Sequence, residues 1–294
     1  MKVVVILLLA SLALSTENPR GVSYWDRDRN LEFINFTSAP NSNRNVIVLH
    51  GMGGLASNFL YLPSDFKLKS MANWWLLTLR NHGNSFDDEV MTVKAMAEDV
   101  VRHIYKYNIR NISLIGYSIG GRVAMYIAAN YSSLIDSMAI LDFMPFAYPN
   151  ALIQPQIMFL NSLLNLNISN MTYDQIKTSL TAALNPADLA LVLSLLEGTG
   201  SDYRFACNIT NIAAAVPTII SQDIPGKAFK KPVKFIFAKK SPYFMSSRVN
   251  ELVNFYPNLD LSKDIIYLEN SDHSFPFTQP ELAIAFIYNF LSAN

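Results

Sequence analysis

The chain has 294 residues, of which 51% are apolar and 16% are charged, and equal numbers of basic and acidic side chains (23 each) give a formal net charge of +0. This composition predicts an ordered globular chain, and the length suits one large α/β domain or two small ones. It also excludes nucleic acid as an expected partner, because no basic surplus is present to displace counterions.

Residues 1–15 have the pattern of a secretory signal peptide, with Lys2 before an apolar run and small residues at 13 and 15 where cleavage could fall. A signal-anchor is the alternative, although the run is short for a membrane span. We therefore expect a secreted or secretory-lumen protein, and lipid contact is left open. Six glycosylation triplets fit this route; they begin at Asn35, Asn111, Asn130, Asn167, Asn170 and Asn208.

Strands and helices alternate through the first half of the domain, which we place at residues 20–294. Two β-type runs at 22–25 and 31–36 predict an opening hairpin. Further strands are expected over 45–49, 74–79, 112–116 and 137–142, and helical segments over 56–70, 92–107 and 118–130. This alternation predicts an α/β fold whose mostly parallel sheet is flanked by helices.

The pattern changes between about residues 147 and 224, where the chain is rich in Leu, Ile and Met and includes a helical piece at 188–196. We interpret this segment as an inserted helical cap rather than as an independent domain. The sheet then resumes. Its last elements are expected to be strands over 233–238 and 264–268 and helices over 246–255 and 280–292.

The segment Gly116-Tyr117-Ser118-Ile119-Gly120 has the pattern of a nucleophile elbow, a strand that turns sharply into a helix and exposes a serine above a sheet. The pentapeptide is a weak pattern by itself, but here it follows an apolar strand and precedes a helical run. The two glycines have a steric reason, since a Cβ at either position would meet the adjoining backbone.

A serine nucleophile needs a base, and the base needs an orienting acid. His273 is the candidate base because it follows the last expected strand, at the carboxyl edge of the sheet. The stretch after the next-to-last strand, around Ser241, contains no carboxylate. Asp142 is the favoured acid, 24 residues after Ser118 at a strand end, with a turn or cap role as the alternative. Asp272 is a poor candidate because neighbouring loop side chains usually diverge.

Acyl transfer also requires donors for the developing oxyanion. The backbone N–H of Ile119, directly after the nucleophile, is one candidate. The second is the N–H of Met52, in the glycine-rich loop that follows the first buried strand. No metal or cofactor is expected, because the four histidines show no metal-ligand spacing. The single Cys207 is interpreted as a partly buried structural thiol.

Together these residues resemble the α/β-hydrolase superfamily, and within it a branch of small serine esterases that includes bacterial acyl esterases and mitochondrial abhydrolase-domain-eleven proteins. The matching segments are 49–54, 80–85, 96–99, 116–121 and 141–145. In that branch the acid can be the aspartate after the post-elbow strand, so the resemblance favours Asp142. The chain departs from the pattern at Tyr117 and Asp272, where His and Gly are more usual.

We therefore expect a serine hydrolase that cleaves carboxylic esters or thioesters through an acyl-enzyme on Ser118. Apolar cap residues either line an acyl pocket or simply pack: Met158, Phe159, Leu163, Leu164, Leu191 and Leu195. One alternative is an inactive binding protein that keeps the fold. Another is a non-esterase member of the fold, such as a lyase or a haloperoxidase; an epoxide hydrolase would need an aspartate at the elbow. The sequence does not define an oligomeric state.

Overall fold

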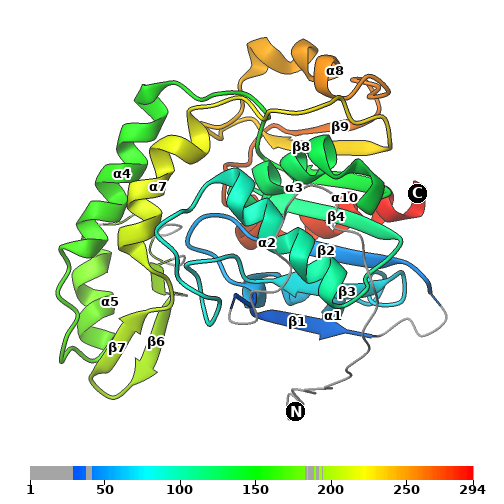
Figure 1. Ribbon diagram of the computed structural model, residues 1–294. Coiled ribbons are helices and arrows are strands. Elements are labelled where there is room, and N and C mark those ends of the chain that lie inside the picture. Colours follow the sequence, from blue (N-terminus) through cyan, green and yellow to red (C-terminus); the bar gives the residue numbers. More distant parts are fainter. Residues whose placement is uncertain are drawn as a thin grey trace.

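The computed structural model describes residues 29–37, 42–182, 184, 189, 192–193 and 195–293 (Figure 1). The expected signal segment, 1–15, and the first expected strand, 22–25, lie outside these residues. Within the described part of the chain, no helix combines the length and the apolar character needed to cross a membrane.

A seven-stranded sheet forms the centre of the molecule, in the order β1-β3-β2-β4-β5-β8-β9. β1 lies at one edge and runs antiparallel to β3, and the other pairs are parallel. The predicted mostly parallel sheet is therefore confirmed. The strands are β1 (Phe33–Phe36), β2 (Asn45–Leu49), β3 (Asn73–Leu77), β4 (Ile112–Tyr117), β5 (Ser137–Leu141), β8 (Val233–Ala238) and β9 (Ile265–Leu268).

Helices cover both faces of this sheet because its central strands are apolar on both sides. In β2, Ile47 and Leu49 face one apolar cluster, whereas Val46 and Val48 face the other. The first cluster packs under α2 (Val93–Lys106) and α3 (Ile119–Asn130), and the second packs under α10 (Pro280–Ala293). Short helical turns complete the shell: η1 (Ala56–Phe59), α1 (Tyr61–Ser64), η2 (Ser132–Leu134), η3 (Ser246–Glu251), α8 (Leu252–Phe255) and α9 (Phe275–Thr278).

The predicted helix over 56–70 is wrong in its length, since this segment forms only η1 and α1. The chain leaves the helical conformation at Asp65, which has ψ 139°. The Asp65 carboxylate accepts hydrogen bonds from the backbone N–H groups of Lys67 and Leu68 at 2.8 and 3.1 Å. Such local side-chain bonds compete with helix continuation.

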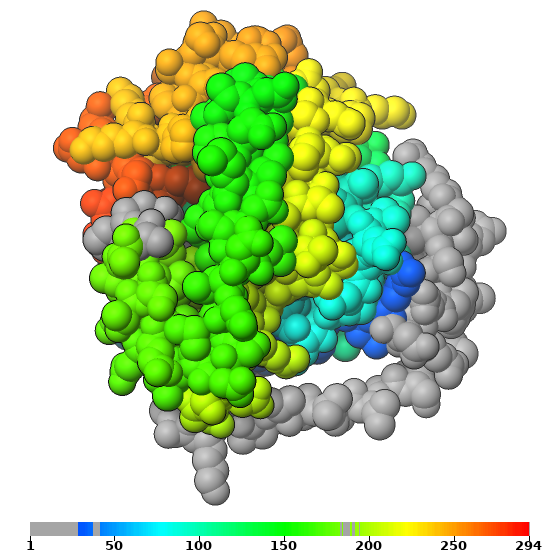
Figure 2. Space-filling model, turned by 90° about the vertical axis from the view of Figure 1, so that its left-hand side faces the viewer, coloured from blue at the N-terminus to red at the C-terminus, as the bar shows by residue number. Residues whose placement is uncertain are grey.

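Between β5 and β8 the chain forms α4 (Asn150–Leu164), α5 (Tyr173–Thr181), the hairpin β6 (Leu196–Thr199) and β7 (Asp202–Phe205), and α7 (Ile209–Ile220). α4 and α7 pack side by side, as adjacent green and yellow ridges in Figure 2. The hairpin was not expected from the sequence. Leu196, predicted to end a helix, instead begins β6.

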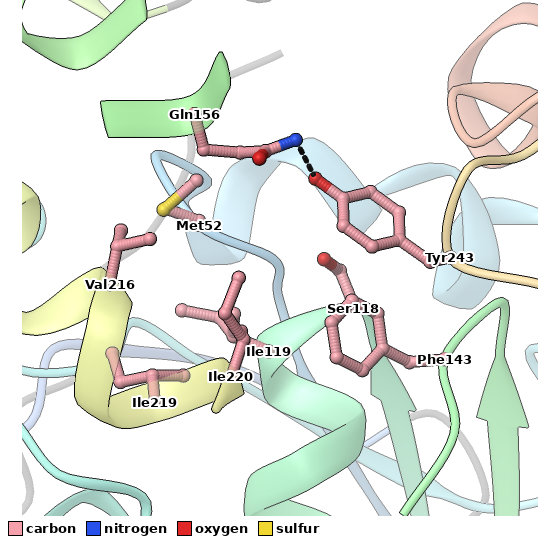
Figure 3. A pocket seen from close by; sticks show the side chains of 9 residues that line it. All are labelled: Met52, Ser118, Ile119, Phe143, Gln156, Val216, Ile219, Ile220 and Tyr243. Atoms are coloured by element: carbon pink, nitrogen blue, oxygen red, sulfur yellow. Dashed lines mark hydrogen bonds between the residues drawn. The ribbon is translucent and has the colours of Figure 1, made fainter. Parts of the chain in front are cut away.

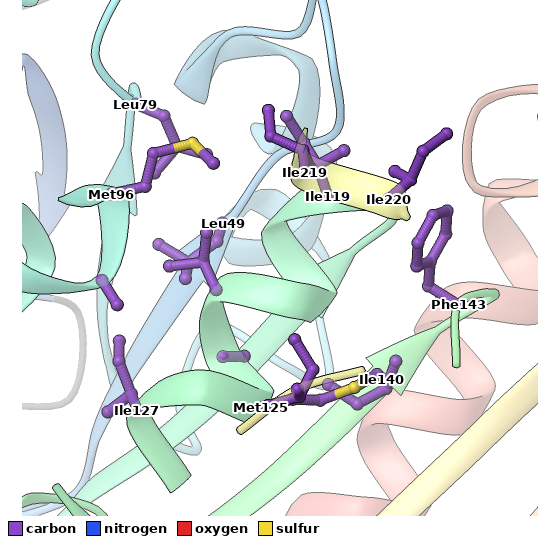
Figure 4. Packing of buried hydrophobic residues seen from close by; sticks show 14 of the residues in the cluster. Leu49, Leu79, Met96, Ile119, Met125, Ile127, Ile140, Phe143, Ile219 and Ile220 are labelled. Carbon is purple, nitrogen blue, oxygen red and sulfur yellow. The ribbon is translucent and has the colours of Figure 1, made fainter. Parts of the chain in front are cut away.

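The carboxyl-terminal end of α7 reaches the centre of the molecule. Ile219 and Ile220 are buried and pack in the same cluster as Ile119, at the start of α3, and Phe143, which follows β5 (Figure 4). The segment between β5 and β8 is therefore packed against the carboxyl edge of the sheet, where the chain turns at residues 118 and 142.

Candidate active site

Ser118 occupies a strained turn between β4 and α3, with φ 53° and ψ −123°. Its N–H donates to the carbonyl of Leu141 at 3.1 Å. A Cβ on Gly116 would lie 2.5 Å from the Gly120 carbonyl oxygen, and one on Gly120 would lie 2.4 Å from the carbonyl oxygen of His50. Both glycines are therefore required by close backbone approach, as the elbow pattern predicts.

The structure brings the three predicted side chains together in one chain of contacts. The Ser118 hydroxyl lies 3.0 Å from Nε2 of His273, and Nδ1 of His273 lies 2.7 Å from Oδ2 of Asp142. The Asp142 side chain is fully buried, whereas that of His273 is 22% exposed. With the Nδ1 proton donated to the carboxylate, Nε2 is left to accept the serine proton.

Asp142 is held by the neighbouring strand as well as by the imidazole. Its Oδ1 accepts a hydrogen bond from the N–H of Ala238 at 2.8 Å, and its own N–H donates to the carbonyl of Ile236 at 2.9 Å. The residue has φ 55°, a left-handed conformation that aspartate tolerates better than most residues. These contacts fix the carboxylate at the end of β5.

Asp272 precedes the base His273 in sequence, but its carboxylate is hydrogen-bonded within the local turn. Its Oδ1 accepts hydrogen bonds from the N–H and the hydroxyl of Ser274 at 2.9 and 2.6 Å. After β8, the Ser241 hydroxyl likewise accepts from the N–H of Tyr243 at 3.2 Å. Neither side chain occupies the position beside His273 that Asp142 fills.

The two residues predicted to supply the oxyanion donors, Met52 and Ile119, line the same pocket as Ser118. Ile119 is the first residue of α3, where backbone N–H groups have no partner within the helix. Met52 lies in a tight turn closed by a 3.0 Å bond from the N–H of Gly54 to the carbonyl of Gly51.

Two buried histidines, His50 and His82, hold this turn. Nε2 of His82 accepts the N–H of Gly53 at 3.0 Å, and its Nδ1 donates to the carbonyl of Arg80. The His50 ring packs edge-on against His82 and accepts the N–H of Leu79. Burial lowers the pKa of His82 to about 4 and that of His50 well below its ordinary value. Both rings are neutral and act as hydrogen-bond acceptors.

The loop that carries His82 is anchored on two sides. The Arg80 guanidinium binds the buried Asp99 carboxylate of α2 through bonds of 2.6 and 2.8 Å. On the other side, Gly83 N–H donates to the carbonyl of Ala206 at 2.6 Å, beside β7. The 80–85 segment, one of those that match the family pattern, therefore supports the Met52 turn.

Tyr117 and Arg122 are further supporting residues that the sequence reasoning missed. The Tyr117 hydroxyl donates to the backbone carbonyl of His273 at 2.9 Å, and its ring stacks on the imidazole. Arg122, buried in α3, donates to the carbonyls of Met144 and Phe146 after β5. A charged residue within an otherwise apolar helical run was the available signal for Arg122.

A small pocket of about 20 Å³ lies beside the Ser118 hydroxyl (Figure 3). Its walls are mostly apolar: Met52, Ile119, Phe143, Gln156, Val216, Ile219, Ile220 and Tyr243. Of the cap residues for which pocket lining and packing were the alternatives, Met158 and Leu164 do not line this pocket and are 69% and 43% exposed. Leu163 and Leu195 are buried in the core, and Leu191 lies outside the described residues. Helix α7 supplies three apolar lining residues, Val216, Ile219 and Ile220.

No group of three His, Cys, Asp or Glu side chains suited to a metal ion occurs within the described ranges. Cys207 is half-buried beside the 80–85 loop, and burial raises the pKa of its thiol to about 12. A thiol with so high a pKa is a poor nucleophile at neutral pH.

The strand order, the strand–Ser118–helix turn and the inserted segment between β5 and β8 together define an α/β-hydrolase fold. A family model described as alpha/beta hydrolase fold matches residues 44–170. The resemblance found in the sequence is therefore confirmed.

Curated relatives include the sn-1-specific diacylglycerol lipase ABHD11 of Xenopus laevis, which is 24% identical over 220 residues, covering 72% of this chain and 69% of that protein. Esterase YbfF of Escherichia coli (strain K12) is 28% identical over 229 residues, covering 76% of this chain and 86% of that protein. Among solved structures, a marine microorganism esterase matches with a TM-score of 0.81 at 22% identity, covering 89% of this chain and 99% of the other.

Proposed function

We propose that this protein is a serine hydrolase that cleaves carboxylic esters, thioesters included, through an acyl-enzyme on Ser118. The observation that carries the proposal is the continuous contact from Asp142 through His273 to the Ser118 hydroxyl, with bonds of 2.7 and 3.0 Å. The names of the two curated relatives, a lipase and an esterase, support the same reaction class.

In the proposed reaction His273 accepts the Ser118 proton as the serine oxygen attacks the ester carbonyl. The developing oxyanion is stabilised by the N–H groups of Met52 and Ile119, each worth roughly 3 kcal/mol if placed as in other oxyanion holes. Protonated His273 then returns its proton to the leaving alcohol or thiol. Water, activated by the same imidazole, releases the acid and restores the serine.

The size of the pocket favours an ester with small substituents. Its volume of about 20 Å³ is close to that of one or two water-sized groups, and its apolar wall comes from Val216, Ile219 and Ile220 of α7. A short acyl or alkoxy group suits this space, whereas a long chain would have to extend beyond the pocket.

A fluorophosphonate probe and a series of p-nitrophenyl esters of increasing acyl length test the proposal. We expect covalent labelling of Ser118, and turnover that is highest for short acyl groups and is lost in Ser118→Ala. If Ser118 were not labelled, or if Ser118→Ala turned the esters over at the wild-type rate, the proposal would be wrong. An inactive binding protein would give no labelling, whereas labelling of Ser118 without turnover of any ester would indicate a non-esterase member of the fold.

We also propose secretion, supported by the pattern of residues 1–15 and by two well-exposed glycosylation triplets. Asn167 and Asn170 both lie on the surface between α4 and α5. Expressed with its own N-terminus in a eukaryotic host, the protein should reach the medium, begin after about residue 15 and lose mass on deglycosylation. Retention in the membrane fraction would instead indicate a signal-anchor.

A further inference from the structure

Gln156 is the one polar side chain that the segment between β5 and β8 contributes to the described pocket wall. It comes from α4, and its side chain reaches the pocket from the side opposite to Ser118 (Figure 3). Its Nε2 donates to the Tyr243 hydroxyl at 2.7 Å. Its Oε1 is buried and has no hydrogen-bond partner among the described residues.

A buried acceptor without a partner is costly, and such groups in native proteins usually have a specific reason. The bond from Nε2 to the Tyr243 hydroxyl holds one end of the amide, so that in the structure the oxygen is the end that faces the pocket. Tyr243 is itself held, since its backbone carbonyl accepts the Tyr148 hydroxyl at 3.0 Å and its ring packs 4.4 Å from the His273 ring. The oxygen is thus kept at a defined position beside the nucleophile.

We propose that Oε1 of Gln156 accepts a hydrogen bond from a hydroxyl or N–H group of the substrate and thereby selects esters that carry such a donor near the scissile bond. This inference rests on the proposed esterase function and adds to it a class of substrate. An amide oxygen only accepts, so it favours donors over ether or carbonyl groups of similar size. The other side chains of the wall are apolar, apart from the hydroxyl-bearing Ser118 and Tyr243.

The size of the pocket restricts where the donor lies. Ser118 and Gln156 line the same cavity of about 20 Å³, so the donor must be only a few atoms from the ester carbonyl. Two parts of a substrate meet this condition. The donor can belong to a short hydroxy- or amino-acyl group, or to a small alcohol that keeps a second hydroxyl.

Two pairs of nearly isosteric esters separate these sources. In the first pair, ethyl glycolate carries the hydroxyl in its acyl part and ethyl propionate lacks it. In the second pair, hydroxyethyl butyrate carries the hydroxyl in its alcohol part and propyl butyrate lacks it. For each pair the ratio of kcat/KM values is measured in the wild type, in Gln156→Met and in Gln154→Met. Gln154 is the matched control, because it is an exposed glutamine on the same helix.

We expect the hydroxy-ester preference to fall about tenfold in Gln156→Met in at least one pair and to stay within twofold of wild type in Gln154→Met. Because both esters of a pair are measured with the same enzyme, the ratio of their kcat/KM values does not depend on the fraction of folded protein. Comparing this ratio between variant and wild type removes differences in the intrinsic reactivity of the esters. An unchanged ratio in both pairs would overturn the inference while leaving esterase activity intact. No turnover of any ester, together with no labelling of Ser118, would remove the proposed function and this inference with it.

Discussion

Asp142 accepts hydrogen bonds from two elements at once, the imidazole of His273 and the backbone of β8. In Asp142→Asn the side-chain oxygen can keep the bond to Ala238, but the amide group would then donate toward Nδ1 of His273. That contact favours the wrong imidazole tautomer, with its proton on Nε2. We expect kcat to fall roughly 10³- to 10⁴-fold in steady-state ester hydrolysis, with the fold intact by circular dichroism.

Asp272→Asn is the matched control for this prediction. The asparagine oxygen can still accept the bonds from Ser274 that the carboxylate accepts, so we expect kcat within a fewfold of wild type. If Asp272→Asn were the more damaging of the two substitutions, the assignment of the acid to Asp142 would be wrong.

We expect Tyr117 to position the base, because it contacts His273 and does not line the pocket. Tyr117→Phe keeps the ring stacked on His273 but removes the hydroxyl that binds the His273 carbonyl. The base is then less firmly placed, so we expect kcat to fall about tenfold while KM stays within twofold. Tyr288→Phe, at a partly exposed tyrosine of α10, should change neither constant. A raised KM with an unchanged kcat would contradict the positioning role.

At the scale of elements, the Met52 turn depends on the loop that follows β3. His82→Phe removes the acceptor for the Gly53 N–H and leaves the turn free to shift. Because loss of one oxyanion donor costs about 10² to 10³ in kcat, we expect a fall of up to this size with little change in KM. His103→Phe is the comparison variant, since His103 is buried against the rings of Phe33 in β1 and of Tyr107, which follows α2. Equal losses of kcat in both variants would indicate a general packing defect.

The elements that could be predicted are those whose signal is local. β2, β4, β5 and β8 are continuous apolar runs, and α2 shows a regular apolar stripe, so their limits agree with prediction to within a residue or two. The β6–β7 hairpin gave no such signal, because its strands are four residues long and half-exposed. Its turn requires the left-handed Gly200, with φ 67°, which the surrounding Leu-rich sequence obscured.

In the candidate site, too, the residues that could be predicted are those with a local sequence signal. Ser118, His273 and Asp142 could be named because each stands at a recognisable place, the elbow or the end of a strand. Arg122 and Gln156 could not, because what gives them a role is a contact across the fold. Arg122 binds the carbonyl of Gln222, 100 residues away in sequence, and Gln156 binds Tyr243, 87 residues away. Neither pairing leaves a trace in local spacing.

At the scale of the whole molecule, the buried histidines link stability to pH. Burial lowers the pKa of His82 to about 4 and that of His103 to about 3, from about 6.5 in the unfolded chain, and it also lowers that of His50. Below about pH 6.5 the unfolded chain therefore binds more protons than the folded one, and stability falls as pH falls. Each of the two groups with a stated value would cost about 2 kcal/mol at pH 5 relative to pH 8.

We therefore expect urea midpoints to decrease steadily between pH 7 and pH 5, a range in which ordinary carboxylates are still mostly ionised. His103→Phe removes one of the titrating groups, so its midpoint should depend less steeply on pH than that of the wild type, whatever its absolute stability. The exposed substitution Tyr288→Phe should leave the slope unchanged. A wild-type midpoint that is constant or rises on acidification would show that these histidines are not neutral in the folded protein, and the hydrogen-bond acceptor role of His82 in the Met52 turn would then be wrong.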